Sequence, residues 1–502
     1  MTIPYAGAAF QLYDPDGNKI VMSYTYPEYT EIDTFYTTED GMLITPQKLP
    51  YGKDYSLVEV TAPYGYVLDS TPIFFNVTAD TATGDGAITV VKVKRPNMPQ
   101  KGIIKITKTG EVFQTVTEQS GVYQPVYEIG KLSGAVFEIR AAEDIYTLDG
   151  VLHYTKGEVV DTVTSGSDGI AVSKQLYLGK YFLQERSTDS HYILCDTKFP
   201  FEFAYAGQDV EVVEITANNG EAITNNLKYG SVSGLKVDED GKTIAGAKFG
   251  LFRNDETEYT EKNALMTAVS GENGIFRFDN IPVGTWVVRE LVPAEGFVLN
   301  ELSYQVTITA HEQVIEITLE NRYIRSDILG HKVDEDGEVI SGALFGLFKD
   351  GTEEFTEDAA FMTAASGPDG KFLFENVRYG KWIVKELSCP EQYVLSDEVF
   401  EVSIEEDGAV LSLTAVNKHV TGKMQAVKIS SKDHDKLLSG AEFEIYLDVN
   451  GNQTFDPGID TLIGKLTESE TGFYEMDGLK HNGYFLFESK APEGFQKDDR
   501  YF

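Results

Sequence analysis

The stretch GTWVVRELVPAEGF (residues 284–297) has the pattern of a β-strand that runs into a turn, and one of its residues is out of place. Successive side chains of a strand point to opposite faces, so Trp286, Val288 and Glu290 share one face. Trp286 and Val288 are residues expected in a core. The alternation therefore predicts that the carboxyl group of Glu290 is buried beside them.

The same arrangement occurs four more times, with an aliphatic residue two positions before the acid and an aromatic residue four positions before it. The four further acidic residues are Glu59, Glu185, Glu386 and Glu488. For a single copy, a solvent-facing Glu on an edge strand is the simpler interpretation. Five copies in the same register favour a buried carboxyl group.

These five segments belong to internal repeats. GLKVDEDGKTIAGAKFGLF (234–252) aligns without a gap to GHKVDEDGEVISGALFGLF (330–348), and looser copies begin at GAAF (7–10), GAVF (134–137) and GAEF (440–443). Short apolar stretches separated by turn residues every 8–12 positions are typical of β-sandwiches. The sequence predicts an all-β, elongated tandem array of immunoglobulin-like or prealbumin-like sandwich domains. The expected domains are 1–99, 100–228 (with an insertion), 229–324, 325–420 and 421–502, called repeats 1 to 5.

The composition excludes several classes of partner. The 502 residues include 80 acidic and 42 basic ones, and this net charge of −38 argues against binding nucleic acid or anionic membranes. No apolar run reaches the roughly 18 residues of a membrane helix, so we expect no membrane insertion. Cys195 and Cys389 lie in different repeats, so disulfides are not expected to stabilise the domains.

An Asn precedes a Lys by 11 residues at every repeat boundary. The four pairs are Asn97 and Lys108, Asn225 and Lys236, Asn321 and Lys332, and Asn417 and Lys428. Each Asn and each Lys ends an alternating apolar stretch, in step with its apolar residues. Lys, Glu and Asn are therefore predicted to face the core from three different strands.

Burial of these three residue types together points to a covalent reaction. A buried charge costs several kcal/mol unless it is paired or neutralised, so burial lowers the pKa of Lys and raises that of Glu. A neutral amine is a nucleophile, and a protonated carboxyl group can polarise an Asn amide and carry its proton. The expected product is a Lys–Asn isopeptide bond, formed once with loss of ammonia. A Lys–Glu salt bridge without that bond is the alternative.

The segments KVDEDG, GAKFGLF, GTWVVRELVPAEGFVL and TLEN resemble the collagen-adhesin B-type (CnaB-like, SpaA-like or prealbumin-like) domains of Gram-positive surface adhesins and pilins. The resemblance covers nearly the whole chain. It implies that an early Lys, the Glu of the E-x-x-A-P-x-G-Y segment and an Asn of the last strand form an isopeptide bond, with the Glu as promoter. By position, the complete sets are Lys108–Glu185–Asn225, Lys236–Glu290–Asn321 and Lys332–Glu386–Asn417.

Two of these sets depart from the family pattern in the turn after the Glu. ERSTDSHY (185–192) lacks the Ala-Pro, and ELSCPEQY (386–393) lacks the Gly. In repeat 2, Asn226 is an alternative to Asn225, although the parity with Ile223 favours Asn225. The acid itself is retained in both cases.

The first and last repeats each contain part of a set. Repeat 1 has Glu59 and Asn97 but begins one strand late, without its Lys. Repeat 5 has Lys428 and Glu488 but ends before a strand with an Asn. We expect both to be incomplete domains of a longer chain, with exposed strand edges.

One loop of repeat 5 has spacing similar to that of a calcium site. Asp448, Asn450, Asn452 and Asp456 occupy positions 1, 3, 5 and 9 of DVNGNQTFDPGID (448–460), but Ile459 stands where a bidentate Glu is required. A plain turn rich in Asp and Asn is the alternative. No other cofactor is expected.

The resemblance implies a structural stalk of a cell-surface adhesin or pilin-like protein, extracellular and anchored to the cell wall in the full-length protein. The only chemistry expected is a single intramolecular turnover, so the chain is not predicted to be an enzyme. One alternative is a module that binds a host protein or glycan through the Tyr-rich insertion at 111–134. Another is a noncatalytic appendage of a secreted enzyme.

Overall fold

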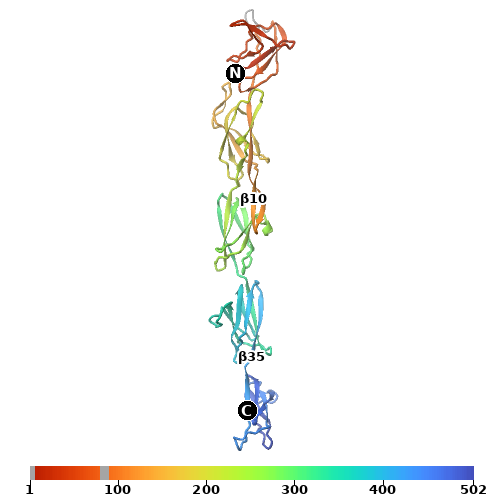
Figure 1. Ribbon diagram of the computed structural model, residues 1–502, viewed down its shortest axis with the longest axis vertical. Coiled ribbons are helices and arrows are strands. Elements are labelled where there is room, and N and C mark those ends of the chain that lie inside the picture. Colours follow the sequence, from red (N-terminus) through yellow and green to blue (C-terminus); the bar gives the residue numbers. More distant parts are fainter. Residues whose placement is uncertain (1–5, 80–89) are drawn as a thin grey trace.

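The computed structural model describes residues 6–79 and 90–502, and it shows five β-rich domains that follow one another end to end in an elongated array (Figure 1). Strands account for nearly all of the regular structure. In the described residues the helical segments are two short 3-10 turns, Ala217–Gly220 and Glu261–Asn263. The predicted fold class, an all-β array of tandem sandwich domains, is confirmed.

Repeat 3 shows the architecture of a complete domain. One sheet has three strands in the order β24-β21-β27, and the other has four in the order β23-β22-β25-β26. Phe249, Phe276 and Val288 are fully or almost fully buried between the two sheets. The strands are β21 (Tyr229–Asp238), β22 (Lys248–Arg253), β23 (Met266–Val269), β24 (Ile275–Pro282), β25 (Gly284–Val292), β26 (Tyr304–Ile308) and β27 (Val314–Asn321).

Repeat 4 repeats this arrangement with the sheets β31-β28-β35-β33 and β30-β29-β32-β34. In both repeats the first and last strands are parallel neighbours, β21 with β27 and β28 with β35. The chain therefore enters and leaves each domain through adjacent strands. The strands are β28 (Arg325–Asp334), β29 (Leu344–Lys349), β30 (Met362–Ala365), β31 (Lys371–Arg378), β32 (Gly380–Ser388), β33 (Tyr393–Val394), β34 (Val399–Ile404) and β35 (Val410–His419).

Repeat 2 is built around one long strand, β9 (Lys101–Gln119), which forms a hairpin with β10 (Val122–Lys131). The closing strands β19 (Val212–Thr216) and β20 (Ile223–Asn225) pair with β9 in parallel. The second sheet has the order β14-β11-β17-β18. Its strands are β11 (Val136–Ala141), β14 (Val159–Thr164), β17 (Gly179–Ser187) and β18 (Lys198–Phe203), and the remaining strands are β12 (Ile145–Tyr146), β13 (Leu152–Tyr154), β15 (Ile170–Val172) and β16 (Leu176–Tyr177).

Repeats 1 and 5 have smaller sheets. In repeat 1 the main sheet is β4-β1-β5-β7, accompanied by the pairs β2-β3 and β6-β8, and in repeat 5 the two sheets are β36-β40-β39 and β38-β37-β41. The strands of repeat 1 are β1 (Ala9–Tyr13), β2 (Met22–Tyr24), β3 (Thr30–Ile32), β4 (Phe35–Tyr36), β5 (Gly52–Thr61), β6 (Tyr66–Val67), β7 (Ile73–Val77) and β8 (Met98–Pro99). Those of repeat 5 are β36 (Thr421–Val427), β37 (Glu442–Leu447), β38 (Thr461–Lys465), β39 (Thr467–Glu470), β40 (Phe473–Lys480) and β41 (Tyr484–Lys490).

A glycine on the first strand makes room for the aromatic core beside the candidate site. A Cβ atom at Gly234 would lie 2.0 Å from the ring of Phe276, which stacks on Phe249 with ring centroids 3.8 Å apart. In repeat 4 a Cβ atom at Gly330 would likewise lie 1.9 Å from the ring of Phe372. Both positions exclude any side chain, so the stacked rings can approach the first strand closely.

Among the described residues, no helix has the length and apolarity needed to cross a bilayer.

Candidate functional site

In repeat 3 three strands bring Lys236, Glu290 and Asn321 together inside the sandwich. Lys236 lies on β21 and Asn321 ends β27, in one sheet, whereas Glu290 reaches them from β25 in the other sheet. Their exposed fractions are 0%, 2% and 2%. Three polar residues that the sequence places in core register are thus buried side by side.

Repeats 2 and 4 contain the same cluster on the corresponding strands. The residues are Lys108, Glu185 and Asn225 in repeat 2, and Lys332, Glu386 and Asn417 in repeat 4, and none is more than 2% exposed. Asn226, the alternative to Asn225, is exposed. The structure thus brings Asn225 into the cluster and leaves Asn226 outside it.

In each complete repeat the Asn amide donates to the Glu carboxyl group. Nδ2 of Asn321 lies 2.8 and 2.9 Å from the two carboxyl oxygens of Glu290. Nδ2 of Asn225 lies 3.0 and 2.9 Å from those of Glu185, and the single contact of Asn417 to Glu386 is 3.0 Å. The nitrogen that would leave as ammonia is therefore the atom closest to the acid.

The other atom of each amide has no partner. The Oδ1 atoms of Asn225, Asn321 and Asn417 are buried without a hydrogen bond, and they are three of the few such side-chain atoms in the described residues. A buried acceptor without a donor costs about 1–3 kcal/mol.

The three lysines approach the last strand at one common place. Nζ of Lys236 donates to the carbonyl oxygen of Leu319 at 3.1 Å, and Nζ of Lys332 to that of Ala415 at 3.1 Å. Each of these carbonyls lies two residues before the Asn of the cluster. Nζ of Lys108 is bound equivalently to Ile223, at 3.0 Å. The amine is thus held against the strand that carries the Asn.

The Lys–Glu contacts are longer than ordinary ion pairs. Nζ of Lys108 lies 3.7 Å from Glu185, and Nζ of Lys332 lies 3.8 Å from Glu386. Burial has the largest effect on the protonation of these lysines, and the nearby acid opposes it only in part. Burial lowers the pKa of Lys236 to about 8, and it lowers the pKa of Lys108 and of Lys332 as well.

The acid of repeat 3 is shifted in the opposite direction. Burial raises the pKa of Glu290, although the backbone N–H of Asn300 and the amide of Asn321 oppose the shift. A lowered Lys pKa and a raised Glu pKa both favour the neutral forms, the amine and the carboxylic acid. These are the forms that nucleophilic attack on an amide requires.

A β-bulge places the Glu at the site in every repeat. Glu290 pairs with Phe249 next to a register shift at Lys248 and Phe249. The other acids pair with the Phe of their own GAxF motif at the same kind of irregularity, namely Glu59 with Phe10, Glu185 with Phe137, Glu386 with Phe345 and Glu488 with Phe443. Bulges commonly re-aim a side chain. The GAxF motif therefore marks the residue opposite the acid, which the sequence did not reveal.

A backbone donor ten residues after the Glu was also missed. The N–H of Asn300 donates to Oε2 of Glu290 at 2.7 Å. The equivalent donors, with their distances to Oε2, are Asp69 (3.2 Å), Cys195 (2.8 Å), Ser396 (3.0 Å) and Asp498 (2.9 Å). Because the donor is a backbone group and the five residues are of four types, Asn, Asp, Cys and Ser, no sequence pattern identifies it. Oε2 of Glu290 thus accepts from this N–H and from Nδ2 of Asn321, whereas Oε1 accepts from Nδ2 of Asn321 alone.

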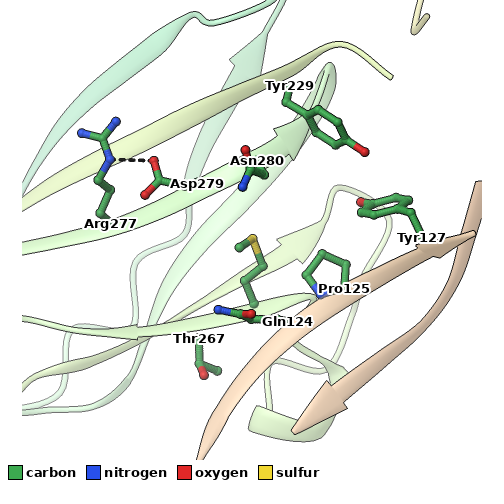
Figure 2. Close-up of a pocket in the computed structure, with 9 residues that line it drawn as sticks. Gln124, Pro125, Tyr127, Tyr229, Thr267, Arg277, Asp279 and Asn280 are labelled. Atoms are coloured by element: carbon green, nitrogen blue, oxygen red, sulfur yellow. Dashed lines mark hydrogen bonds and ion pairs between the residues drawn. The ribbon is translucent and has the colours of Figure 1, made fainter. Parts of the chain in front are cut away.

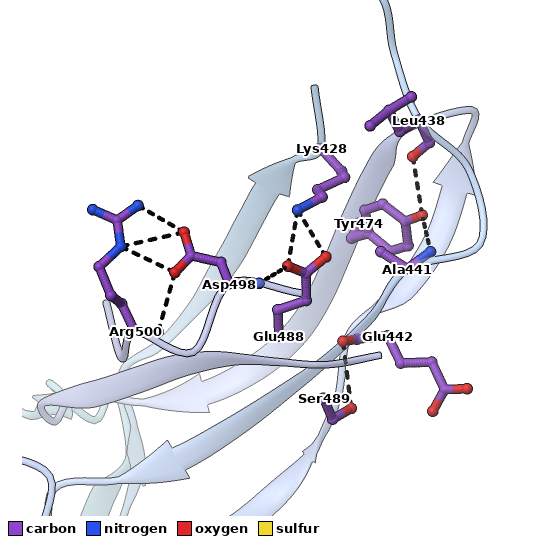
Figure 3. A network of polar contacts seen from close by, with 9 residues as sticks. All are labelled: Lys428, Leu438, Ala441, Glu442, Tyr474, Glu488, Ser489, Asp498 and Arg500. Carbon is purple, nitrogen blue, oxygen red and sulfur yellow. Dashed lines mark hydrogen bonds and ion pairs between the residues drawn. The ribbon is translucent and has the colours of Figure 1, made fainter. Parts of the chain in front are cut away.

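The first and last repeats bring together the residues that were predicted for them. In repeat 1, Nδ2 of Asn97 lies 2.9 and 2.8 Å from the carboxyl oxygens of Glu59, whose pKa is raised by burial. In repeat 5, Nζ of Lys428 lies 2.7 Å from Glu488, and the backbone of Asp498 contacts the same carboxyl group (Figure 3). The Lys428–Glu488 distance is about 1 Å shorter than in the complete repeats.

The loop proposed for calcium is closed by its own hydrogen bonds. The side-chain amides of Asn450 and Asn452 both donate to Oδ2 of Asp456, at 2.8 and 2.7 Å. Asp448 accepts from the backbone of Asn452 and of Gln453. The four predicted ligands lie in one loop, and their contacts with one another are those of a turn rich in Asp and Asn. Calcium binding by this loop stays a prediction.

The Tyr-rich insertion lies against the neighbouring repeat. Most of residues 111–134 belongs to the hairpin of β9 and β10, and the ring of Tyr127 packs edge-on against that of Tyr229, with centroids 5.9 Å apart. Arg253 of repeat 3 lies over the ring of Phe113. These aromatic side chains thus make contacts between repeats 2 and 3, and binding of a host protein or glycan by the insertion stays a prediction.

Solved structures match the chain at low sequence identity. The Bacillus anthracis TIE protein is 18% identical, with a TM-score of 0.45 over 80% of this chain and 71% of its own. BcpA, the major pilin subunit of Bacillus cereus, is 17% identical, with a TM-score of 0.29 over 64% of this chain and 100% of its own. SpaD, a major pilin of Corynebacterium diphtheriae, is 15% identical, with a TM-score of 0.19 over 64% of this chain and 97% of its own.

No curated protein sequence matches the chain. A family model does match it, and repeatedly: the SpaA prealbumin-like fold domain is found at residues 2–92, 128–220, 230–323, 326–419 and 422–502. These matches cover most of the sequence and coincide with the five β-rich units of the structure. The chain therefore belongs to the SpaA family of prealbumin-like domains, which it carries five times in tandem.

Proposed function

We propose that the chain is a structural stalk of a Gram-positive cell-surface adhesin or pilin-like protein, and that repeats 2, 3 and 4 are each closed by a Lys–Asn isopeptide bond. The observation that carries the proposal is the burial of Lys, Glu and Asn together in all three complete repeats. Burial of three polar residues in a dry core lowers the stability of the fold, which a function of these residues would explain. Bond formation replaces the primary amine and the primary amide by one secondary amide and releases ammonia.

The reaction follows from the positions of the atoms in repeat 3. The neutral Nζ of Lys236 attacks Cγ of Asn321, and the protonated carboxyl group of Glu290 polarises the amide. A C–N bond forms to Nζ, the bond from Cγ to Nδ2 breaks, and Nδ2 leaves as ammonia. Glu290 gives one proton to the leaving nitrogen and receives one from Nζ, so it ends in its starting state. Fixed reactants in a closed core have a high effective concentration.

The location of the bond suits a protein under tension. Lys236 lies on the first strand of its domain and Asn321 on the last, and these strands are parallel neighbours. A covalent link between them carries a pulling force directly from one linker to the next, and the rest of the sandwich is bypassed. It also slows unfolding, and with it proteolysis and thermal inactivation.

The overall shape and charge support the same role. Five domains in a row extend the chain, as a stalk requires (Figure 1). The net charge of −38 keeps such a rod soluble in an extracellular medium. Each site reacts once and is consumed, so the activity is a maturation step and not enzymatic turnover. The alternative function, a noncatalytic appendage of a secreted enzyme, requires a catalytic domain elsewhere in the parent protein.

Peptide mapping tests the proposal at single-residue level. Trypsin does not cleave after an acylated lysine, so a bonded repeat 3 yields one branched peptide that joins the segment around Lys236 to the segment that ends at Arg322. The proposal predicts this branched peptide, short of one ammonia, and its counterparts from repeats 2 and 4. Linear peptides cleaved after Lys236 in fully folded protein would show that only a buried polar cluster exists.

A further inference from the structure

The hairpin of β9 and β10 crosses from repeat 2 onto repeat 3 and is attached there near its tip and near its base. Close to the tip, the N–H of Tyr123 donates to Oγ1 of Thr267 at 2.9 Å, and Val116 packs against the core of repeat 3. Closer to the base, Tyr127 contacts Tyr229. The hairpin is thus held at two points on a domain to which it does not belong in sequence.

Between these points lies a cleft of about 440 Å³. Figure 2 shows Pro125 and Tyr127 of the hairpin on one side and Tyr229 and Asn280 of repeat 3 on the other, whereas Thr267 lies beside Gln124. Ligand sites occur preferentially in such recesses between domains. The cleft is lined by Gln124, Pro125, Tyr127, Tyr229, Met266, Thr267, Arg277, Asp279 and Asn280.

Several polar groups that line the cleft have no hydrogen-bond partner in residues 6–79 and 90–502. The side-chain amides of Gln124 and Asn280 and the hydroxyl group of Tyr127 make no hydrogen bond with any described residue. Asn280 has a positive φ of 56°, so a tight bend at this point of β24 holds it at the edge of the cleft. These groups offer donors and acceptors to whatever enters.

The lining carries no net charge. Nε of Arg277 is paired with Asp279 at 2.6 Å, and the remaining lining residues are neutral. A second depression of about 230 Å³ shares Gln124 and is lined otherwise by Thr117, Gln119, Ser120 and Val122, which are also uncharged. In a chain with 24% charged residues, the two depressions share Gln124 and present mainly amide, hydroxyl and aromatic groups. Together they are called the groove.

We infer that this groove binds a neutral oligosaccharide. Sugar hydroxyl groups pair well with amides and hydroxyls that present both donors and acceptors, as Gln124 and Asn280 do. Tyr127 and Tyr229 add aromatic rings that carry a hydroxyl group, and such rings can pack against the apolar face of a sugar ring. An acidic sugar is disfavoured, because the overall charge of −38 repels anions and Arg277 is already neutralised by Asp279.

Repeat 4 provides an internal comparison. Asn376 and Thr363 lie 96 residues after Asn280 and Thr267, and Asn376 has nearly the same φ, 55°. The hairpin that covers this surface in repeat 3 belongs to repeat 2 alone, so the cleft is specific to the junction of repeats 2 and 3. The inference does not depend on the isopeptide bonds, because the groove contains none of their residues.

Isothermal titration of the full chain with maltotriose, chitotriose, lacto-N-tetraose and the acidic sialyllactose tests the inference. We expect at least one neutral probe to bind with a dissociation constant below 1 mM, on the weak side of ordinary ligand affinities, and sialyllactose to bind less well. Gln124→Ala and Tyr127→Phe remove groups without partners and keep the aromatic contact, so the fold is retained. Together they should weaken binding at least tenfold, whereas Asn376→Asp should leave it unchanged.

Three results would overturn the inference. The first is that none of the three neutral probes gives heat or a saturation-transfer NMR signal. The second is that the Gln124→Ala, Tyr127→Phe double variant binds a neutral probe as tightly as the parent protein does, and the third is that sialyllactose binds more tightly than the neutral probes. None of these results bears on the mass or the peptide map of the protein. A failure here is therefore separable from a failure of the proposed isopeptide bonds.

Discussion

Lys236 lies directly opposite Leu319 in the parallel pairing of β21 with β27, and its amine donates to the carbonyl oxygen of that residue at 3.1 Å. Asn321 follows two positions later on the same face of the last strand. The parallel pairing of the first and last strands therefore brings the amine of Lys236 to the strand that carries the amide of Asn321. The same register, with Lys332 opposite Ala415, recurs in repeat 4.

Removal of the acid should stop the reaction in one repeat only. Glu290→Gln keeps the shape of the side chain but cannot shuttle a proton, so repeat 3 should retain its ammonia while repeats 2 and 4 lose theirs. Glu290→Ala should do the same. Intact mass spectrometry measures the difference. Glu316→Ala, at an exposed position of β27, is the matched control and should leave the mass loss complete.

The backbone donor to Glu290 should tune the pH range of the reaction. Asn300→Pro removes the N–H that lowers the pKa of Glu290, so this pKa rises further and the carboxyl group stays protonated to higher pH. We expect a smaller bonded fraction in freshly purified protein, because Oε2 is no longer held. We also expect the unreacted remainder to react up to a higher pH, as followed by mass during incubation across pH 6–10.

Asn300→Ala is the control for that variant, because it keeps the N–H and removes only the side-chain contacts. It should retain the original pH profile. Identical profiles for the Pro and Ala variants would show that the backbone donor has no part in the chemistry.

An unreacted Lys236 should make repeat 3 more stable at high pH. Its pKa is about 8 in the folded state and about 10.5 when unfolded, so between these values the unfolded state binds more protons. Stability then rises as pH increases through this window. In Asn321→Ala, where no bond can form, the free energy of unfolding should increase from pH 8 to pH 10.5. The bonded repeat has no free amine and should lack this increase.

Tryptophan fluorescence can measure this in the full chain. Trp286 in repeat 3 and Trp382 in repeat 4 are the only two tryptophans of the sequence. In a Trp382→Phe background, urea unfolding followed by fluorescence reports on repeat 3 alone. The account is contradicted if Asn321→Ala and the parent protein show the same dependence on pH above pH 8.

The residues of the candidate site could be predicted from the sequence because strand alternation has a period of two. Glu290 falls in step with Trp286 and Val288, and a shift of one residue would expose it. The same parity distinguishes Asn225 from Asn226, and the structure buries the former and exposes the latter. The prediction also depended on the five copies, because a single Glu in core register is more simply explained as a solvent-facing residue on an edge strand.

Other features have no signature in the sequence. The bulge at Phe249 and the N–H of Asn300 depend on backbone geometry, which no side chain specifies. The sequence of the insertion at 111–134 shows that it is rich in Tyr. The alternation of apolar and polar residues does not show whether a strand stays within its own domain or extends onto the neighbouring domain. The docking of the insertion on Thr267 results from contacts 144 residues apart in the chain.

The intact mass of the full chain under denaturing conditions shows whether the isopeptide bonds have formed. The account predicts a mass lower than that of the sequence by three ammonia molecules, one each for repeats 2, 3 and 4. Repeats 1 and 5, whose clusters lack the Lys or the Asn within this sequence, should contribute no loss. A mass equal to that of the unmodified sequence would contradict the account, and the buried Lys, Glu and Asn would then be a noncovalent polar cluster.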